Sequence, residues 1–325
     1  MAVRPDTLPA GADRFEEHRR ELAGYCYRML GSSFEADDAV QETMVRAWKA
    51  ADSFEGRSSV RSWLYRIATN VCLDMLRGRR RRALAMDLGP AGDADAFHER
   101  SLPGNAWVEP VPDGRVLPGG GDPAELAAGR ETIRLAFVTA LQELPPRQRA
   151  VLILREVLRW QATEVAELLD TSVASVNSAL QRARARLAER RPHAGGAHPD
   201  PADPEQRALL ARYVDAFERY DIASLVALLH HDAVMSMPPY DFWLSGPEQM
   251  ARWFTGEGSG CEGSRLVATA ANGGTAFGSY RVDPAGGHAP WSIQLLELRD
   301  GRVVGHHNFL DTALFPAFGL PAHLD

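Results

Sequence analysis

The sequence has no long apolar run and few cysteines. Nowhere do about 18 apolar residues follow one another, so no membrane-spanning helix is expected. The first residues, MAVRPDTLPAGADRFEE, lack the apolar core of a secretory signal. The 3 cysteines, Cys26, Cys72 and Cys261, are too far apart for metal-ligand spacing, and an odd, sparse set argues against a disulfide framework. We therefore expect a cytoplasmic protein with no membrane partner, no metal site and no cofactor.

Charge is divided unevenly along the chain, whose net charge is −7. Residues 13–82 and 123–191 each carry a net charge of +3, whereas 83–122 carry −5 and 200–325 carry −8. Two basic segments thus alternate with an acidic linker and an acidic C-terminal part. Such asymmetry points to a polyanionic partner for the basic segments.

Composition also predicts the domain boundaries. Residues 83–122 are rich in Gly, Pro and Asp, and we expect a linker with no stable element beyond local contacts around Trp107. Residues 192–204, PHAGGAHPDPADP, are expected to form a second linker. The predicted domains are 13–82, 123–191 and 205–325.

Residues 160–190 have the pattern of two helices joined by a tight turn. Val173, Val176, Leu180, Ala183 and Leu187 form one apolar stripe, and Ser172 precedes it as a plausible N-cap. Small and amide side chains at a helix start can approach base edges in a DNA major groove, although an ordinary helical hairpin has the same stripe. The candidate DNA contacts are Ser175, Asn177, Ser178, Gln181, Arg182 and Arg184.

Residues 13–82 are predicted to contain only helices. Ser32 and Glu35 form a capping-box pattern before the second helix, and the third is expected from about Val60 to Arg77. Trp63 lies on the apolar stripe of the third helix and is interpreted as a core residue. The second helix is expected to pack through Val40, Met44, Ala47 and Trp48.

Two segments of the chain resemble the sigma-70 family. DDAVQETMVRAW followed by SVRSWLYRIATNVCLDMLR resembles region 2, and LPPRQRAVLILREVLRWQATEVAELLDTSVASVNSALQRARARL resembles region 4. Only these two regions occur, which is similar to the extracytoplasmic-function (ECF) group of RNA polymerase sigma factors. The resemblance implies an initiation factor, not an enzyme, that directs core polymerase to promoters. A stand-alone helix-turn-helix regulator is the alternative, but it would need no region 2.

The resemblance also implies a role for each surface. The second helix would dock on the β′ clamp helices of core RNA polymerase, Leu144–Arg159 would face the β flap, and 160–190 would read the −35 element of promoter DNA. The acidic edge expected on the β′ clamp comprises Asp37, Asp38, Gln41 and Glu42. The −10 element would be held by Phe54, Arg57, Ser58, Arg61, Arg66, Asn70 and Arg77, with Arg77–Arg82 on backbone phosphate.

The linker around Trp107-Val108-Glu109-Pro110 resembles that of a subgroup with a C-terminal extension. In the family this linker threads toward the polymerase active centre. We hypothesise that its acidity mimics nucleic acid in that channel.

Residues 205–325 are expected to form an α+β domain. Helices come first, strands follow, and Asp300-Gly301 predicts a two-residue hairpin turn. This order resembles the SnoaL-like, nuclear-transport-factor-like cone, which encloses an apolar pocket with a few polar groups. The predicted fold class is therefore two all-α domains followed by an α+β cone. The apolar tail Phe309–Leu320 would cover the sheet or clamp the sigma domains.

A small-molecule ligand of this domain is a candidate partner, and a regulatory role is expected. The alternative is a SnoaL-like enzyme that carries DNA-binding accessory domains. His306 and His307 alternate along a strand, so only one can point inward, and no catalytic residue is assigned. The candidate pocket residues are Asp215, Tyr240, Trp243 and His307.

Overall fold

The structure is a computed structural model that describes residues 13–54, 56, 58–189 and 203–325. The chain divides into two units. The first comprises the described parts of Met1–Arg79, Arg115–Gly121 and Ala140–Arg190, and the second comprises those of Arg80–Gly114, Asp122–Thr139 and Arg191–Asp325. Most of the predicted linker 192–204 lies outside the described residues. Within the described ranges, no helix is long and apolar enough to cross a membrane.

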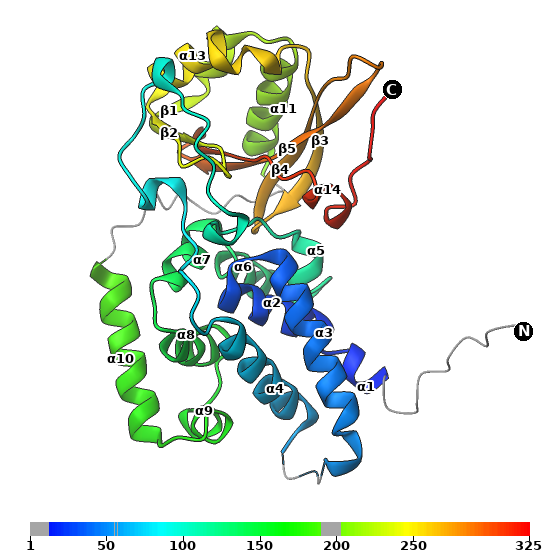
Figure 1. Cartoon of the computed structure of the whole chain (residues 1–325), viewed down its shortest axis with the longest axis vertical. Helices are drawn as coiled ribbons and strands as arrows, with labels where there is room; N and C mark the ends of the chain where they lie inside the picture. The colour runs from blue at the N-terminus through cyan, green and yellow to red at the C-terminus, as the bar shows by residue number, and fades with distance from the viewer. Residues whose placement is uncertain (1–12, 55, 57, 190–202) are drawn as a thin grey trace, which may run out of the picture. The chain divides into compact units, whose positions relative to one another are not determined.

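The N-terminal part of the first unit is helical, as its apolar stripes predict. Gly31 ends its second helix with φ of 71°, a left-handed conformation that favours glycine. Ser32 Oγ accepts a hydrogen bond from the Glu35 N–H at 3.2 Å and so begins the next helix. The helices are α1 (Asp13–Glu16), α2 (Arg19–Leu30), α3 (Ser33–Lys49) and α4 (Val60–Met75) (Figure 1).

The other part of the first unit carries the predicted helix-turn-helix. It contains α8 (Pro146–Leu152), a π-helical turn (Ile153–Val157), α9 (Ala162–Leu168) and α10 (Val173–Glu189); α7 (Leu135–Gln142) precedes them.

Buried Arg149 on α8 joins the two parts of the first unit. Its Nη1 donates to the Met29 carbonyl at the end of α2, and to Gln142 Oε1 at 2.6 Å. Burial lowers the pKa of Arg149 to about 10. Parts of the predicted domains 13–82 and 123–191 thus pack within one unit, whereas residues 80–82 and 123–139 belong to the second unit.

Residues 203–325 form a six-stranded sheet with helices on both of its faces. The strand order is β2-β1-β6-β5-β4-β3; β1 and β6 run parallel, and the other neighbours run antiparallel. The strands are β1 (Leu229–Ser236), β2 (Trp243–Ser245), β3 (Arg265–Ala271), β4 (Gly274–Val282), β5 (His288–Arg299) and β6 (Arg302–Phe309). The helices are α11 (Pro204–Glu218), α12 (Ile222–Ala227), α13 (Pro247–Thr255) and α14 (Leu314–Ala317). The predicted fold class is confirmed.

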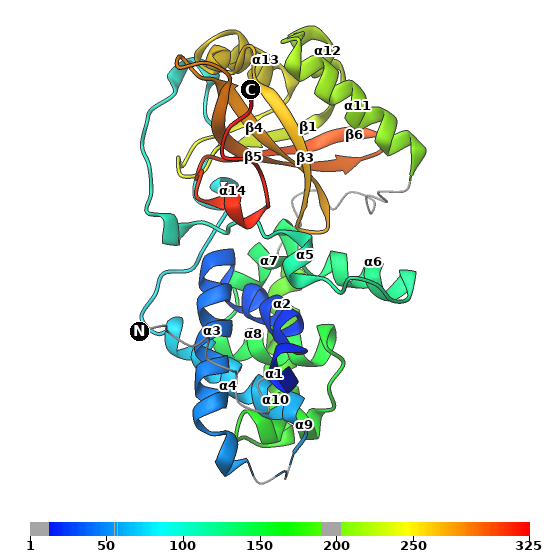
Figure 2. The same ribbon diagram turned by 90° about the vertical axis from the view of Figure 1, so that its right-hand side faces the viewer.

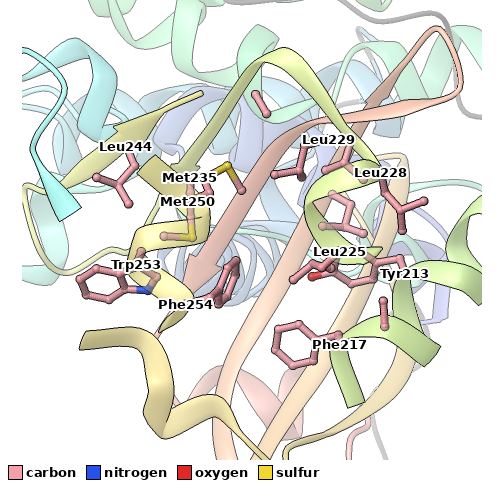
Figure 3. Packing of buried hydrophobic residues seen from close by; sticks show 14 of the residues in the cluster. Tyr213, Phe217, Leu225, Leu228, Leu229, Met235, Leu244, Met250, Trp253 and Phe254 are labelled. Atoms are coloured by element: carbon pink, nitrogen blue, oxygen red, sulfur yellow. The ribbon is translucent and has the colours of Figure 1, made fainter. Parts of the chain in front are cut away.

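The main core of the second unit lies between the sheet and α11, α12 and α13 (Figure 2). Figure 3 shows Phe217 of α11 and Phe254 of α13 on facing sides of this core, and their ring centroids are 6.4 Å apart. Truncating either ring to alanine would cost about 3–5 kcal/mol through lost burial and an unfilled cavity. On the opposite face, Phe315 of α14 packs edge-on against Tyr280, so the apolar tail covers the sheet.

The first predicted linker, 83–122, is structured, which corrects the expectation of no stable element. It contains 3-10 turns at Ala85–Asp87, Ala94–Ala96 and Gly104–Ala106, and the helices α5 (Asp113–Val116) and α6 (Pro123–Glu131) follow. The expected local contacts are present: the Val108 N–H donates to the Ala83 carbonyl at 3.2 Å, and Trp107 is buried. Residues 83–114 belong to the second unit, and Figure 1 shows them in cyan beside α13 and β2.

Candidate nucleic-acid interface and ligand cavity

The helix-turn-helix has one packed face and one polar face. Val165, Ala166 and Leu168 of α9 and Val176, Leu180 and Ala183 of α10 are buried. Asp170 has φ of 49° in the turn, and Ser172 Oγ accepts from the Ser175 N–H at 3.1 Å to cap α10.

The residues predicted to read DNA lie on the other face of α10. Ser175, Asn177, Gln181, Arg182 and Arg184 are exposed, and Ser178 is half-buried. Arg182 Nη1 donates to Ser178 Oγ at 2.6 Å, whereas Arg184 forms an ion pair with Glu156 at 2.6 Å. The arrangement offers hydroxyl and amide groups at the helix start and guanidinium groups one to two turns later, as major-groove readout requires.

The residues predicted to hold a melted strand lie on or near α4. Ser58, Asn70 and Arg77 are exposed, and Phe54 packs on Trp63 with ring centroids 4.9 Å apart. Trp63 is only half-buried, so the prediction of a core role for it holds in part. The predicted site residue Arg57 lies outside the described residues.

Two of these arginines are engaged within the first unit. The Arg61 guanidinium forms an ion pair with Glu21 at 2.8 Å, and it lies 5.4 Å from the centre of the Trp160 ring. Arg66 Nη2 donates to the Glu167 carbonyl of α9 at 2.9 Å. Segments of the predicted −10 surface and of the helix-turn-helix therefore contact each other. A DNA strand that uses both arginines must replace these contacts.

Not all of the basic run Arg77–Arg82 is free for phosphate. Arg82 is buried, and its Nη1 donates to the Trp107 carbonyl at 2.6 Å and the Gly104 carbonyl at 3.1 Å. This corrects the prediction for Arg82, because a charged group at the edge of a folded linker satisfies backbone carbonyls instead. Arg77 keeps an exposed guanidinium and pairs with Asp74 at 3.0 Å.

The face of α3 that was predicted to bind polymerase carries both polar and large apolar side chains. Asp38, Gln41 and Glu42 are exposed, while Asp37 is half-buried and forms an ion pair with Arg115. Trp48, predicted to be in the core, is 56% exposed, which corrects that prediction. Phe34 and Val45 are also exposed large apolar side chains on this helix. Tryptophan is a common anchor of protein–protein interfaces, and helical periodicity alone did not reveal that Trp48 is exposed.

The second unit contains a partly open cavity of about 160 Å³. Of the predicted pocket residues, Tyr240 lines it. The other three lie elsewhere, which corrects their placement. Asp215 is exposed and pairs with Arg219 at 2.7 Å, and Trp243 Nε1 donates to the Gly89 carbonyl at 3.0 Å. His307 points to the opposite side of its strand and bonds Ser236 Oγ through Nδ1 at 2.8 Å.

His306 is the histidine that lines the cavity. The Tyr213 hydroxyl donates to Gln294 Oε1 at 3.0 Å and lies 2.9 Å from His306 Nε2. Burial, and secondarily the neighbouring His307, lowers the pKa of His306 to about 3, so the ring is neutral. Among the described residues, His306 forms no ion pair with a carboxylate. The arrangement suits hydrogen bonding to a ligand better than proton transfer at neutral pH.

Asn272 joins the linker to the β3–β4 hairpin. It has φ of 53° and Gly273 has φ of 74°, so they form a tight turn. Asn272 Oδ1 accepts from the Val111 N–H at 3.0 Å, and its Nδ2 donates to the Ile133 carbonyl at 2.7 Å. The Gly273 N–H donates to Asp113 Oδ1 at 2.8 Å, and burial raises the pKa of that carboxyl. The sequence pattern Asn-Gly is typical of such a turn, but it does not reveal which groups the turn binds.

One group of possible metal ligands occurs among the described residues, at His230, His231 and Asp232 on β1. The Arg299 guanidinium donates to His230 Nδ1 at 3.0 Å and to Asp232 at 2.9 Å. A cation therefore already satisfies these groups, and they do not form a convincing metal site.

Three family models match parts of this chain. Models of sigma-70 region 2, sigma-70 region 4 and the SnoaL-like domain match residues 14–82, 134–187 and 210–306, respectively. The ECF RNA polymerase sigma factor SigG of Mycobacterium tuberculosis is 46% identical over 320 residues, which cover 95% of this chain and 83% of SigG. SigJ of the same species is 28% identical over 302 residues, covering 89% of this chain and 88% of SigJ.

A crystal structure of SigJ from Mycobacterium tuberculosis has the same fold. It matches with a TM-score of 0.61 at 22% sequence identity, covering 95% of this chain and 99% of that one.

Proposed function

The chain belongs to the ECF RNA polymerase sigma factors, and on this basis we propose which of its surfaces bind promoter DNA and which bind polymerase. As a sigma factor it directs core RNA polymerase to promoter DNA and initiates transcription. The observation that carries the promoter proposal is the two-faced helix α10, whose buried stripe leaves Ser175, Asn177 and Gln181 exposed. We assign this face to the −35 element.

We assign the −10 element to α4 and the loop before it. Asn70 offers an amide on the exposed side of α4, and Arg77 offers a cation just after the helix ends. Arg61 and Arg66 can join them once their contacts with Trp160 and Glu167 are replaced. The exposed side of α3 is assigned to the β′ clamp helices and Leu144–Arg159 to the β flap. Polymerase would then set the distance between the two DNA-reading surfaces, and the free chain would bind DNA weakly.

We propose that the C-terminal domain regulates initiation through the linker and binds a ligand without transforming it. Support comes from acidic linker residues that are engaged in the second unit: Asp93 and Asp95 pair with Arg252, and Asp113 accepts from Gly273. Release of the linker would free these carboxylates to mimic nucleic acid in the polymerase channel. We propose that the protein acts in the cytoplasm, with polymerase and DNA.

The proposal is tested by adding the purified chain to core RNA polymerase. Promoter-specific transcripts are expected with the full chain, and their yield is expected to fall with an Asn177→Ala/Gln181→Ala variant. A Glu189→Ala variant at the far end of α10 serves as the matched control. DNA binding by the free chain, followed by fluorescence anisotropy, is expected to be weak. Tight, sequence-specific binding without polymerase would overturn the two-surface account.

A further inference from the structure

The cavity of the second unit is walled partly by the sigma linker. Phe97 and Glu99 of the linker line it together with residues from α13, β1 and β4–β6. The Phe97 ring packs edge-on against Tyr240, Phe242 and Trp253, with centroids 5.1–5.3 Å apart. A molecule in the cavity therefore touches a segment that lies outside the SnoaL-like match at 210–306.

Hydrogen bonds hold the linker against residues 239–249 on both sides of Phe97. Before it, the Gly92 N–H donates to the Trp243 carbonyl at 2.8 Å, and the Ala94 N–H donates to Gln249 Oε1 at 2.9 Å. After it, the Leu102 N–H donates to the Pro239 carbonyl at 2.8 Å. Residues 92–102 thus form a strap over the cavity.

The polar groups of the cavity define what it can bind. Tyr213 has one O–H and donates it to Gln294 Oε1, so its oxygen accepts from His306 Nε2–H. The neutral His306 ring then keeps a lone pair on Nδ1, which is an acceptor. Gln294 keeps its amide NH₂ as a donor.

Asn308 adds a second amide. The residue is only 7% exposed and lines the cavity, and within the described chain its side chain has no hydrogen-bond partner. Its amide atoms are not fully buried, so they remain available to a polar molecule in the cavity. Much of the remaining wall is aromatic, from Tyr240, Trp253, Phe254 and Trp291. Glu99, Glu257 and Arg281 also line the cavity, and their one net negative charge disfavours an anionic ligand.

Size sets the remaining limit. An apolar protein cavity of about 150 Å³ holds one benzene ring, and this cavity is about 160 Å³ with Phe97 in place. We propose that it binds a neutral one-ring molecule that bears a hydroxyl donor and a carbonyl acceptor, and that this ligand stabilises the docked position of the strap 92–102. The inference rests on the proposed regulatory role of the C-terminal domain.

The strap and the ligand are linked thermodynamically. A ligand that contacts Phe97 binds more tightly when the strap is docked, so by reciprocity the bound ligand stabilises the docked strap. Because the strap belongs to the segment that connects regions 2 and 4, the ligand would bias a part of the chain that polymerase engages.

Three probes at pH 7 test the site in the full chain, without polymerase or DNA: 4-hydroxyacetophenone, ethylbenzene as the apolar control and 4-hydroxybenzoate as the anionic control. Binding is read from tryptophan fluorescence, since Trp253 and Trp291 line the cavity. The ketone is expected to bind at least about tenfold more tightly than either control, the effect of roughly one satisfied hydrogen bond.

Variants identify the groups responsible. Asn308→Leu should lower the affinity for the ketone about tenfold and leave the affinity for ethylbenzene equal or higher. Asp215→Asn, at an exposed position outside the cavity, is the matched control and should change neither affinity. Absence of binding by all three probes, equal affinity for them, or an unchanged Asn308→Leu variant would overturn the site.

Amide hydrogen exchange tests the strap. The ketone should slow exchange in β5 and β6, which line the cavity, and also in residues 92–102; in Phe97→Ala the slowing in 92–102 should disappear. If exchange slows only in β5 and β6 of the unaltered chain, the link to the strap is overturned but the ligand site is still supported. Promoter-specific transcription is measured separately, so its failure is distinguishable from failure of this ligand site.

Discussion

Asn272 and Val111 exchange two hydrogen bonds. The Val111 N–H donates to Asn272 Oδ1 at 3.0 Å, and the Asn272 N–H donates to the Val111 carbonyl at 3.1 Å. The same side chain donates from Nδ2 to the Ile133 carbonyl. One residue at the tip of a hairpin therefore holds both the linker and the segment just before the region 4 match.

Replacing Asn272 by alanine should release this part of the linker. The change leaves the Val111 N–H and the Ile133 carbonyl without side-chain partners, and alanine tolerates φ of 53° less well than asparagine. We expect a loss of about 2–4 kcal/mol in linker docking. Amide hydrogen exchange of residues 107–113 measures it.

Two further variants separate the causes. Asn272→Gly keeps the turn and removes both side-chain bonds, whereas Asn272→Asp keeps the acceptor for Val111 and loses the donor to Ile133. Exchange in 107–113 should be fast in the glycine variant and intermediate in the aspartate variant. Full protection in Asn272→Gly would show that the side chain does not hold the linker.

Substitutions on α10 should separate base reading from phosphate binding. Asn177→Ala and Gln181→Ala are expected to cost about 1–3 kcal/mol on the preferred −35 sequence and to reduce discrimination among sequences. Arg182→Ala should weaken binding to all −35 sequences to a similar degree. Transcription by the holoenzyme on a library of randomised −35 elements measures both effects, and a uniform loss for Gln181→Ala would contradict base reading.

Trp48→Ala should impair polymerase binding without unfolding the chain. The ring is 56% exposed, so its removal creates no core cavity, but a docking surface loses an aromatic anchor. We expect about 2 kcal/mol weaker binding to core polymerase, an effect of the size seen for interface anchors. Leu64→Ala, a fully buried residue on α4, is the contrast: it should lower the melting temperature. Unchanged affinity in Trp48→Ala would remove this residue from the interface.

Acid should destabilise the second unit through His306. Its pKa is about 3 in the folded chain, because of burial, against an ordinary 6.5. Between pH 6.5 and 3 the unfolded state binds a proton that the folded state does not, so stability falls as pH falls. The contribution is up to about 1.4 kcal/mol per pH unit in this window.

His306→Gln keeps a neutral hydrogen-bonding group and removes the titration. Urea unfolding of both proteins at pH 7 and pH 5 should show a difference in pH dependence of about 2 kcal/mol. Equal pH dependence in the two proteins would contradict a buried, neutral His306.

Features set by local sequence were predicted well. Helices α4 and α10 follow from apolar periodicity, the start of α3 follows from Ser32, and the β5–β6 turn follows from Asp300 and Gly301, both in the left-handed region. Each depends on residues a few positions apart, where sequence spacing determines geometry.

Features set by distant partners were missed. The Gly- and Pro-rich linker has little intrinsic structure, but its backbone groups are satisfied by the second unit, as in the bond from Gly92 to the Trp243 carbonyl. Alternation predicted that one of His306 and His307 points inward, but the choice depends on the register against β5, which shifts between Glu297 and Leu298. Trp48 lies on the predicted apolar stripe of α3, yet it is exposed, whereas Ala47 beside it is buried.

The most direct measurement is transcription of fragmented genomic DNA from the source organism by core polymerase and the purified full chain, with sequencing of RNA 5′ ends. A promoter-directing factor should yield start sites preceded by a shared −10 and −35 pair at constant spacing, and Asn177→Ala/Gln181→Ala should reduce those starts selectively. Start sites no more frequent than with core polymerase alone, or without a shared upstream pair, would contradict the account.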